Sequence, residues 1–293
     1  MNNIFCISNF NKKKLFELLD KKNKSKRIVL SEAFGSFCEK IQFDKNQQFV
    51  VKGYRKKNNQ YNAIFYEGKS LKFLHERFPK LFPKIYYIDK NLFVMQYISN
   101  NKIKNNISEK DLAIKISKIH KNTNDKFGFE FDTPVGGFRQ PCKFQKSWVD
   151  FFEKKRLFTI FNKINTTNPM PKQINIGIEK LLKKLKDLIP DNPQPSLIHG
   201  DLWSGNMLFN DGKLVGLVDP GIYYAPKEME IAYLKWFNAI SYNFYNYYSE
   251  TISFDKDFFN YSEVYELYYS LLNVYLWDRS YINDVARLVN KFN

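Results

Sequence analysis

In the first hundred residues the apolar positions follow two patterns, one typical of β-strands and one typical of an α-helix. Three short runs are rich in β-branched and aromatic residues, which favours β-strands, and they lie at 27–34, 36–43 and 48–54. From 60 to 78 the apolar residues recur every three or four positions, which predicts an amphipathic helix that Pro79 ends. Two further strand-like runs follow at 84–89 and 91–98. The pattern therefore predicts a small β-rich lobe with a helix between its third and fourth strands.

From Ser108 onward the apolar spacing is mostly helical. Ser108 followed by Asp111 resembles a capping box and predicts that a helix starts there. Further helices are expected at 147–161, 174–188, 228–248 and 257–277. Between them, two apolar runs flank Asp211-Gly212, a pair typical of a tight hairpin turn. We therefore expect an α+β chain with two lobes, a β-rich one over residues 1–98 and a mainly helical one over residues 99–293.

Composition and charge narrow the class of protein. The chain has 293 residues, 44% of them hydrophobic, and 46 Lys+Arg against 30 Asp+Glu give a formal charge of +16. The basic residues are spread along the whole chain, so we expect no nucleic-acid partner, and the positive field instead favours a polyanion such as a nucleoside triphosphate. No apolar run reaches the ~18 residues of a membrane helix. Because residues 1–14 also lack the pattern of a secretory signal, we expect a cytoplasmic protein with no membrane partner.

The three cysteines support neither a disulfide framework nor a structural zinc site. Cys6, Cys38 and Cys142 are odd in number and widely spaced. Cys38 lies close to the first turn, where a thiol could be sensitive to oxidation. A small, half-buried side chain is the simpler interpretation of this cysteine.

The candidate chemistry lies in the sequence HGDLWSGN, residues 199–206, and in Asp219 after the hairpin. Kinase-type phosphoryl transfer needs a carboxylate near the attacking hydroxyl and oxygen ligands for Mg²⁺. Asp201 and Asn206 have the spacing of the Asp and Asn in a kinase catalytic loop. Since the hairpin turns the chain back, Asp219 can face Asn206 across one Mg²⁺ site while Asp201 points at the acceptor. The alternative is that both aspartates are ordinary turn carboxylates.

Three neighbouring residues are expected to support this loop. His199 is interpreted as a buried histidine whose ring fixes the loop backbone. Glu228 and Glu230, at the start of the helix that follows Asp219, are interpreted as helix-start carboxylates that anchor loops.

The small lobe offers a matching cation. Lys52 follows an apolar run in a strand, where a kinase uses a lysine on the α- and β-phosphates, and Glu67 in the next helix is placed to hold it by an ion pair. The simpler alternatives are a surface lysine at the end of a strand and a solvated glutamate on a helix.

Two further segments are candidates for contact with a nucleotide. Gly35 and Ser36 lie in the turn between the first two strands, where backbone N–H groups could cover phosphates. Met95, Gln96 and Tyr97 come just before the lobe boundary and would supply a connector that binds adenine, with Met95 as an apolar wall. An ordinary edge strand is the alternative for this second segment.

Together these residues resemble the fructosamine kinase family, also called ketosamine-3-kinases, within the protein-kinase-like and aminoglycoside-phosphotransferase-like group. The resemblance rests on HGDLWSGN, on Asp219-Pro220, on KFGF at 126–129 and on WVDFFEKKRL at 148–157. It implies a protein-kinase-like bilobal fold and the cofactors ATP and Mg²⁺. It also implies phosphorylation of the sugar 3-hydroxyl of ribulosamine, erythrulosamine or fructosamine adducts, either as small molecules or as glycated lysines in proteins, and thus a deglycation activity.

The resemblance also assigns roles to single residues. It gives Asp201 the position of the catalytic base, and Asn206 and Asp219 the positions of magnesium ligands. Lys52 matches the lysine that contacts phosphate, and Glu67 matches its partner. Trp203, between the base and the metal ligand, is expected to contact the acceptor. Phe127, Phe129 and Trp148 are candidates for the acceptor side, but the core of the large lobe is the preferred interpretation of all three.

Two other functions remain open at this stage. A small-molecule kinase of the aminoglycoside or choline type would use the same catalytic loop. A binding scaffold without activity has no chemical need for the complete set of charged residues, so we consider it the weaker alternative. The residues rank neither the acceptor sugars nor the possible oligomeric states.

Overall fold

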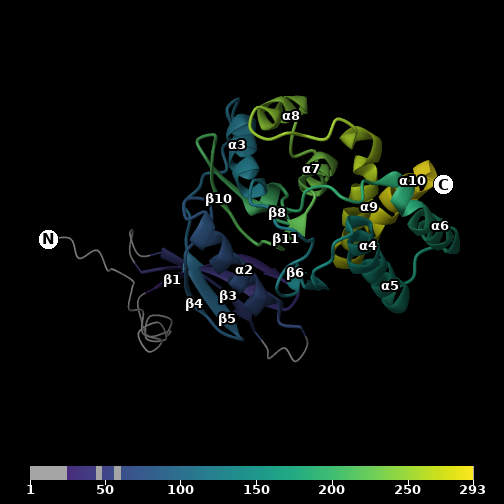
Figure 1. Ribbon diagram of the computed structural model, residues 1–293. Coiled ribbons are helices and arrows are strands. Elements are labelled where there is room, and N and C mark those ends of the chain that lie inside the picture. The colour runs from purple at the N-terminus through teal and green to yellow at the C-terminus, as the bar shows by residue number, and fades with distance from the viewer. Residues whose placement is uncertain (1–24, 44–47, 56–60, 293) are drawn as a thin grey trace.

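The small lobe is a five-stranded antiparallel sheet covered by one helix (Figure 1). The computed structural model describes residues 25–43, 48–55 and 61–292. The strand order is β1-β2-β3-β5-β4. These elements are β1 (Lys26–Ala33), β2 (Ser36–Gln42), β3 (Gln48–Tyr54), α2 (Ala63–Arg77), β4 (Ile85–Ile88) and β5 (Leu92–Gln96). The predicted strands and helix are thus confirmed, while Cys6, residues 1–14 and the first residue of the helix expected at 60–78 lie outside the described residues.

Helix α2 places one charged residue among apolar ones. Asn62 caps the helix, because its side chain accepts a hydrogen bond from the Phe65 N–H (3.0 Å). Glu67, Leu71 and Leu74 are all buried and recur at helical spacing, so they share the face that packs on the sheet. A glutamate on such a face needs a partner, which β3 supplies.

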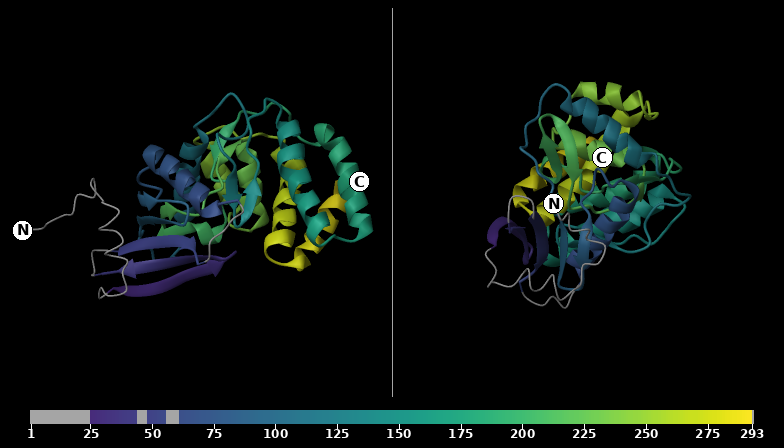
Figure 2. Two further views of the ribbon diagram at one scale, coloured as in Figure 1. Left: turned by 90° about the horizontal axis from the view of Figure 1, so that it is seen from below. Right: turned by 90° about the vertical axis from the view of Figure 1, so that its left-hand side faces the viewer.

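The large lobe is mainly helical, and α9 runs through its centre (Figure 1). Its longer helices are α3 (Ser108–His120), α5 (Phe158–Thr167), α6 (Lys172–Leu188), α7 (Lys227–Trp236), α8 (Tyr242–Ser249), α9 (Phe258–Leu276) and α10 (Ile282–Phe292). A short helix α4 (Trp148–Phe151) continues through a π-helical turn, η2 (Phe152–Leu157), into α5. Figure 2 shows the purple strands of the small lobe at one end of the molecule and the yellow C-terminal helices at the other.

Three two-stranded ribbons complete the large lobe. They pair β6 (Thr133–Val135) with β7 (Phe138–Gln140), β8 (Ser196–Ile198) with β11 (Tyr223–Ala225), and β9 (Met207–Asn210) with β10 (Lys213–Leu217). The predicted hairpin is confirmed, because Asp211 and Gly212 both have positive φ in the turn between β9 and β10. The bipartite α+β architecture expected from the sequence is therefore confirmed. None of the helices in the described ranges is both long and apolar enough to cross a bilayer.

The helix predicted at 228–248 is wrong in one respect, because it is two helices. Helix α7 ends at Trp236 and α8 begins at Tyr242. Between them Asn238 has a φ of 49°, a left-handed conformation that a continuing helix excludes. Ser241 then caps α8 by accepting a hydrogen bond from the Asn243 N–H (3.2 Å). Aromatic residues at helical spacing on both sides of the break concealed it.

The capping box predicted at Ser108 is also wrong. The Ser108 hydroxyl donates to the Gly212 carbonyl (2.9 Å) and accepts from the Asn105 N–H (2.9 Å), so it ties α3 to the hairpin turn. Asp111 likewise accepts from the Leu214 N–H (2.7 Å). Both polar side chains are therefore used between elements, where they hold the hairpin that precedes Asp219.

Removing the two hydrogen bonds of the Ser108 hydroxyl should lower the stability of the protein by a measurable amount. Ser108→Ala removes two hydrogen bonds and leaves the Gly212 carbonyl buried without its donor, so the free energy of unfolding should fall by about 1–2 kcal/mol. Thermal unfolding of this variant measures the effect, with Ser249→Ala at an exposed position of α8 as the control. A melting temperature equal to that of the control would show that the tie contributes nothing.

Candidate active site

A buried ion-pair cluster joins the two lobes. Lys52 on β3 is 9% exposed, and its Nζ donates to Glu67 Oε1 (2.8 Å) and lies 3.1 Å from Asp219 Oδ1. Burial alone would lower the pKa of Lys52, but the Asp219 and Glu67 carboxylates more than offset burial and raise this pKa above its usual value. The ammonium therefore stays charged. The predicted pairing of Lys52 with Glu67 is confirmed, and the contact with Asp219 brings the large lobe to the same point.

Asp219 adopts an unusual backbone conformation just after β10. Its φ is 55°, in the left-handed region that costs free energy for a residue with a Cβ. Its side chain is 40% exposed, so one side of the carboxylate faces open space while the other contacts Lys52. The chain returns here to the loop of residues 199–206, because the Val218 N–H donates to the Asn206 carbonyl (3.1 Å) and the Gly221 N–H donates to the His199 carbonyl (2.9 Å).

The loop after β8 is held in place by Glu230 on α7. This fully buried carboxylate accepts hydrogen bonds from the His199 N–H (3.2 Å) and the Gly200 N–H (2.7 Å), and it pairs with His120 Nε2 (3.0 Å). Burial would raise the pKa of Glu230, but the bonds from His120 and Gly200 outweigh burial and lower it. The predicted role of Glu230 as a loop anchor is confirmed, and Glu228 similarly accepts from the Asp255 N–H (3.3 Å).

His199 and Gly200 fit the loop for different reasons. His199 is fully buried, as predicted, and its Nδ1 accepts from the Asp201 N–H (3.4 Å). Gly200 has a φ of 80°, and a Cβ at this position would lie 2.1 Å from the Gly221 carbonyl oxygen. Only glycine allows the two segments to approach this closely.

The Asp201 carboxylate is held at both oxygens. Asn206 Nδ2 donates to Asp201 Oδ2 (3.1 Å) and to the Asp201 carbonyl (2.8 Å), and the Tyr233 hydroxyl donates to Oδ1 (3.1 Å). Burial, together with the negative charge of Asp219, raises the pKa of Asp201 to about 7 despite these hydrogen bonds. A carboxylate of this basicity can accept a proton from a hydroxyl at neutral pH.

The side-chain oxygens of Asn206 and Asp219 suit a magnesium–nucleotide complex, but they are too few for a metal site built from protein ligands alone. Both donor bonds of the Asn206 amide go to Asp201, so its Oδ1 remains available as a ligand, and Asp219 adds a carboxylate. Within the described ranges no cluster of three or more His, Cys, Asp or Glu residues could hold a metal ion. Mg²⁺ is commonly held by one or two protein oxygens together with substrate phosphates, which is the arrangement that these two residues permit.

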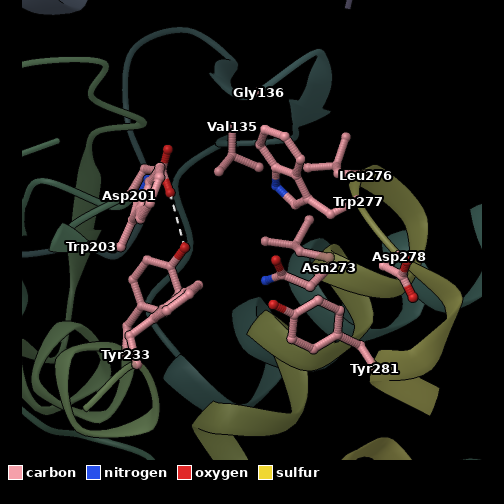
Figure 3. Close-up of a pocket in the computed structure, with 12 residues that line it drawn as sticks. Val135, Gly136, Asp201, Trp203, Tyr233, Asn273, Leu276, Trp277, Asp278 and Tyr281 are labelled. Carbon is pink, nitrogen blue, oxygen red and sulfur yellow. Dashed lines mark hydrogen bonds between the residues drawn. The ribbon is translucent and has the colours of Figure 1, made fainter. Parts of the chain in front are cut away.

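A cavity of about 410 Å³ lies beside Asp201 (Figure 3). One wall carries Asp201, Trp203 and Tyr233, and the opposite wall is formed by the end of α9, from which Asn273 and Trp277 point into the cavity. Of the described residues that line the cavity, none is a lysine, arginine or histidine. In a chain of charge +16 this is a notable depletion of cations. The cavity therefore favours a neutral or cationic ligand with faces that can stack on aromatic rings.

Trp203 lies where a ligand in this cavity would contact it. The indole is half-buried and packs against Phe237 with ring centroids 5.9 Å apart. By contrast Phe127, Phe129 and Trp148 are buried in the core of the large lobe and do not line the cavity. The contact of Trp203 with the acceptor stays a prediction, and the interpretation of the other three as core residues is confirmed.

The turn between β1 and β2 reaches across to the cavity. Phe34 and Gly35 both have positive φ, and the Ser36 hydroxyl donates to the Ala33 carbonyl (2.7 Å) and closes the turn. The Phe34 ring packs edge-on against Trp277 at a centroid distance of 5.3 Å. The Phe34 ring thus brings this turn to the cavity rim, and the contact of Gly35 and Ser36 with phosphate stays a prediction.

The connector between the lobes starts at the end of β5. Met95 is buried, and the Gln96 N–H donates to the Lys84 carbonyl (2.8 Å) within the sheet. Tyr97 is half-buried, with the Lys40 ammonium 3.7 Å from its ring centroid. The Gln96 N–H is thus engaged, so an adenine contact from this segment would come from its other backbone groups or from Tyr97.

Sequence reasoning missed Tyr233 and the far wall of the cavity. Tyr233 follows Glu230 by three residues on α7, so helical spacing places it near the loop that Glu230 anchors. This spacing was the one feature of the sequence that pointed to Tyr233. Asn273 and Trp277 lie about 70 residues beyond Asp201, in a helix whose aromatic composition resembles that of the core.

The chain matches a known family over almost its full length. The fructosamine kinase family model matches residues 18–293. A probable ketoamine kinase of Enterococcus faecium is 31% identical over 188 residues, which cover 63% of this chain and 67% of the relative. The chloroplastic protein-ribulosamine 3-kinase of Arabidopsis thaliana is 26% identical over 216 residues, which cover 68% of this chain and 61% of the relative. The alignments thus span roughly two thirds of these curated relatives.

Solved structures share the fold. A Thermobifida fusca protein assigned as a fructosamine-3-kinase has a TM-score of 0.81 at 19% identity and covers 91% of this chain and 93% of its own. The streptomycin–ATP complex of the aminoglycoside phosphotransferase APH(2″)-IIa has a TM-score of 0.60 at 22% identity and covers 96% of both chains. The predicted protein-kinase-like fold is therefore confirmed.

The structure also predicts how Cys38 reacts. Cys38 lies opposite Lys52 in the β2–β3 ladder, and burial raises the pKa of its thiol to about 12. Since only the thiolate is nucleophilic, alkylation by iodoacetamide at pH 8 should be more than 100-fold slower than in a short peptide containing the same cysteine. Mass spectrometry of the modified peptide measures this rate, and labelling in urea is the control. Equal rates in the folded protein and the peptide would contradict the assignment.

Proposed function

Because the chain belongs to the fructosamine kinase family, we propose that it transfers the γ-phosphoryl group of ATP to the sugar 3-hydroxyl of a ketosamine. The observation that carries this proposal is the convergence of Lys52, Asp219 and Asp201 beside a cavity that contains no basic side chain among its described lining residues. A kinase needs a cation for the phosphates and a carboxylate for the acceptor hydroxyl, next to a space for the acceptor.

On the nucleotide side, we assign Lys52 to the α- and β-phosphates, with Glu67 retaining its ion pair and fixing the ammonium. The backbone of Gly35 and Ser36 would cover the phosphates. Met95, Gln96 and Tyr97 would border the adenine. Asn206 Oδ1 and Asp219 would hold Mg²⁺, which supplies neutralisation of the phosphate charge.

On the acceptor side, Asp201 orients the 3-hydroxyl and accepts its proton as the oxygen attacks the γ-phosphorus, the bond from this phosphorus to the β,γ-bridging oxygen breaks, and ADP leaves. The protein contributes mainly by holding the two reacting groups in line and excluding water. Trp203 would stack on the apolar face of the sugar. The pKa of about 7 for Asp201 suits a base that must both accept and release a proton near neutral pH.

A ketosamine suits the cavity because it carries a secondary ammonium close to the sugar. The cavity offers aromatic faces and a carboxylate, which stabilise an ammonium, and no described cation that would repel it. Trp277 at the rim is 61% exposed, so the arm attached to the amine can extend outward. We therefore include ribulosamine, erythrulosamine and fructosamine adducts, both as small molecules and on glycated lysines of proteins. Because ATP is abundant there, we keep the cytoplasm as the proposed location.

One observation also favours a second candidate. A cavity with no basic side chain among its described lining residues would accept aminoglycosides or choline as well, and the aminoglycoside phosphotransferases share the fold. The two candidates differ in acceptor alone, so the choice of acceptor separates them.

A panel of acceptors tests the proposal. With ribulosamine, erythrulosamine, fructosamine, aminoglycosides and choline, we expect acceptor-dependent ATP consumption only with ketosamines, and phosphorus NMR should place the new phosphate on O3. Asp201→Asn keeps the shape of the side chain but removes the base, so turnover should fall by about 10²–10⁴-fold while MgATP affinity stays within about twofold. Turnover of aminoglycosides alone, or an Asp201→Asn variant of nearly full activity, would contradict the proposal.

A further inference from the structure

Tyr233 is fixed in one orientation by the rings around it. It is 5% exposed, and its ring stacks on Tyr269 with centroids 3.9 Å apart and an angle of 14° between the planes. The edge of Phe237 meets it at 5.0 Å and 76°. A ring packed on two sides has little rotational freedom left to lose, so its hydroxyl is already in place before any substrate binds.

The hydroxyl of Tyr233 has one proton, and this proton points toward Asp201. The proton is donated to Asp201 Oδ1 at 3.1 Å, and Figure 3 shows this bond at the wall of the cavity. Burial, reinforced by the neighbouring Asp201, raises the pKa of Tyr233 well above its usual value, so the phenol does not lose this proton. Toward the cavity the Tyr233 oxygen can therefore only accept hydrogen bonds.

The far wall of the cavity carries an amide that can both donate and accept. Asn273 Nδ2 donates one N–H to the Tyr269 carbonyl (2.8 Å) along its own helix, which leaves the second N–H and the amide oxygen of Asn273 for a ligand. On the near wall, the ionised Asp201 carboxylate and the Tyr233 oxygen can only accept hydrogen bonds from a ligand. A sugar hydroxyl placed between these two groups is directed to donate its proton.

From this geometry we infer that Tyr233 is a positioning residue, which fixes the Asp201 carboxylate and forces the acceptor hydroxyl to donate its proton to that carboxylate. The inference rests on the proposed function, because it concerns the same acceptor site. Without its bond to Asp201 the hydroxyl of a tyrosine here could donate to the attacking oxygen instead and reduce its nucleophilicity. The bond to Asp201 removes that possibility.

Two phenylalanine substitutions in the same pair of stacked rings test the inference. Tyr233→Phe removes the hydroxyl that bonds to Asp201 and keeps the ring. Tyr269→Phe is the matched control, because the Tyr269 hydroxyl is buried and has no hydrogen-bond partner among the described residues. With the full-length protein, MgATP and the ketosamine that the wild-type protein turns over, we expect Tyr233→Phe to lower kcat by about 10- to 100-fold. The KM for ATP and the melting temperature should stay close to wild type, and Tyr269→Phe should keep kcat within about twofold.

The outcomes separate this inference from the proposed function. If the wild-type protein turns over a ketosamine and Tyr233→Phe keeps kcat within about twofold, the inference fails and the proposed function stands. A fall in kcat accompanied by an equal loss of ATP affinity and a lower melting temperature would indicate a general structural role, which also overturns it. A wild-type protein that turns over no ketosamine overturns the proposed function, and this inference with it.

Discussion

The buried ammonium of Lys52 connects the two lobes at the candidate site. It comes from the sheet of the small lobe, and its partners are Glu67 on α2 and Asp219 at the end of the hairpin in the large lobe. Removing one partner of such a buried pair leaves an uncompensated charge, which costs about 3–5 kcal/mol. The position of the small-lobe sheet relative to Asp219 is therefore coupled to the electrostatics of the proposed phosphate site, where a bound triphosphate would compete with Asp219 for the ammonium.

The rest of the site is built outward from this contact by hydrogen bonds to the backbone. Glu230 holds the loop before Asp201, and Ser108 holds the hairpin before Asp219, so both aspartates stand on fixed supports. The basic excess of the chain does not reach the cavity, whose described lining has no cationic side chain. The site thus combines one buried cation on the proposed nucleotide side with two hydrogen-bond acceptors, Asp201 and Tyr233, on the proposed acceptor side. This difference in polarity would keep the two proposed substrates apart.

Local patterns in the sequence predicted the residues of the charge cluster, because each depends on spacing within one element. Asp201 and Asn206 are five positions apart, the Asp211-Gly212 turn returns the chain to Asp219, and Lys52 and Glu67 lie in a strand and the helix that follows it, as in a kinase. Apart from the break at Asn238, the failures involve contacts between distant segments. Ser108 resembles a cap but bonds to a carbonyl 104 residues away, and Tyr233 reaches a carboxylate 32 residues earlier. The spacing of residues within one element cannot indicate such contacts, because they form only when the helices pack together.

A crystal structure with Mg²⁺ and a non-hydrolysable ATP analogue would show whether the triphosphate binds at Lys52. In that complex, Lys52 Nζ should leave Asp219 for the α- and β-phosphates and keep its bond to Glu67. The oxygens of Asn206 and Asp219 should lie about 2.1 Å from Mg²⁺, with the γ-phosphate facing the cavity beside Asp201. A triphosphate bound elsewhere, with Lys52 still paired to Asp219, would contradict the proposed phosphate site.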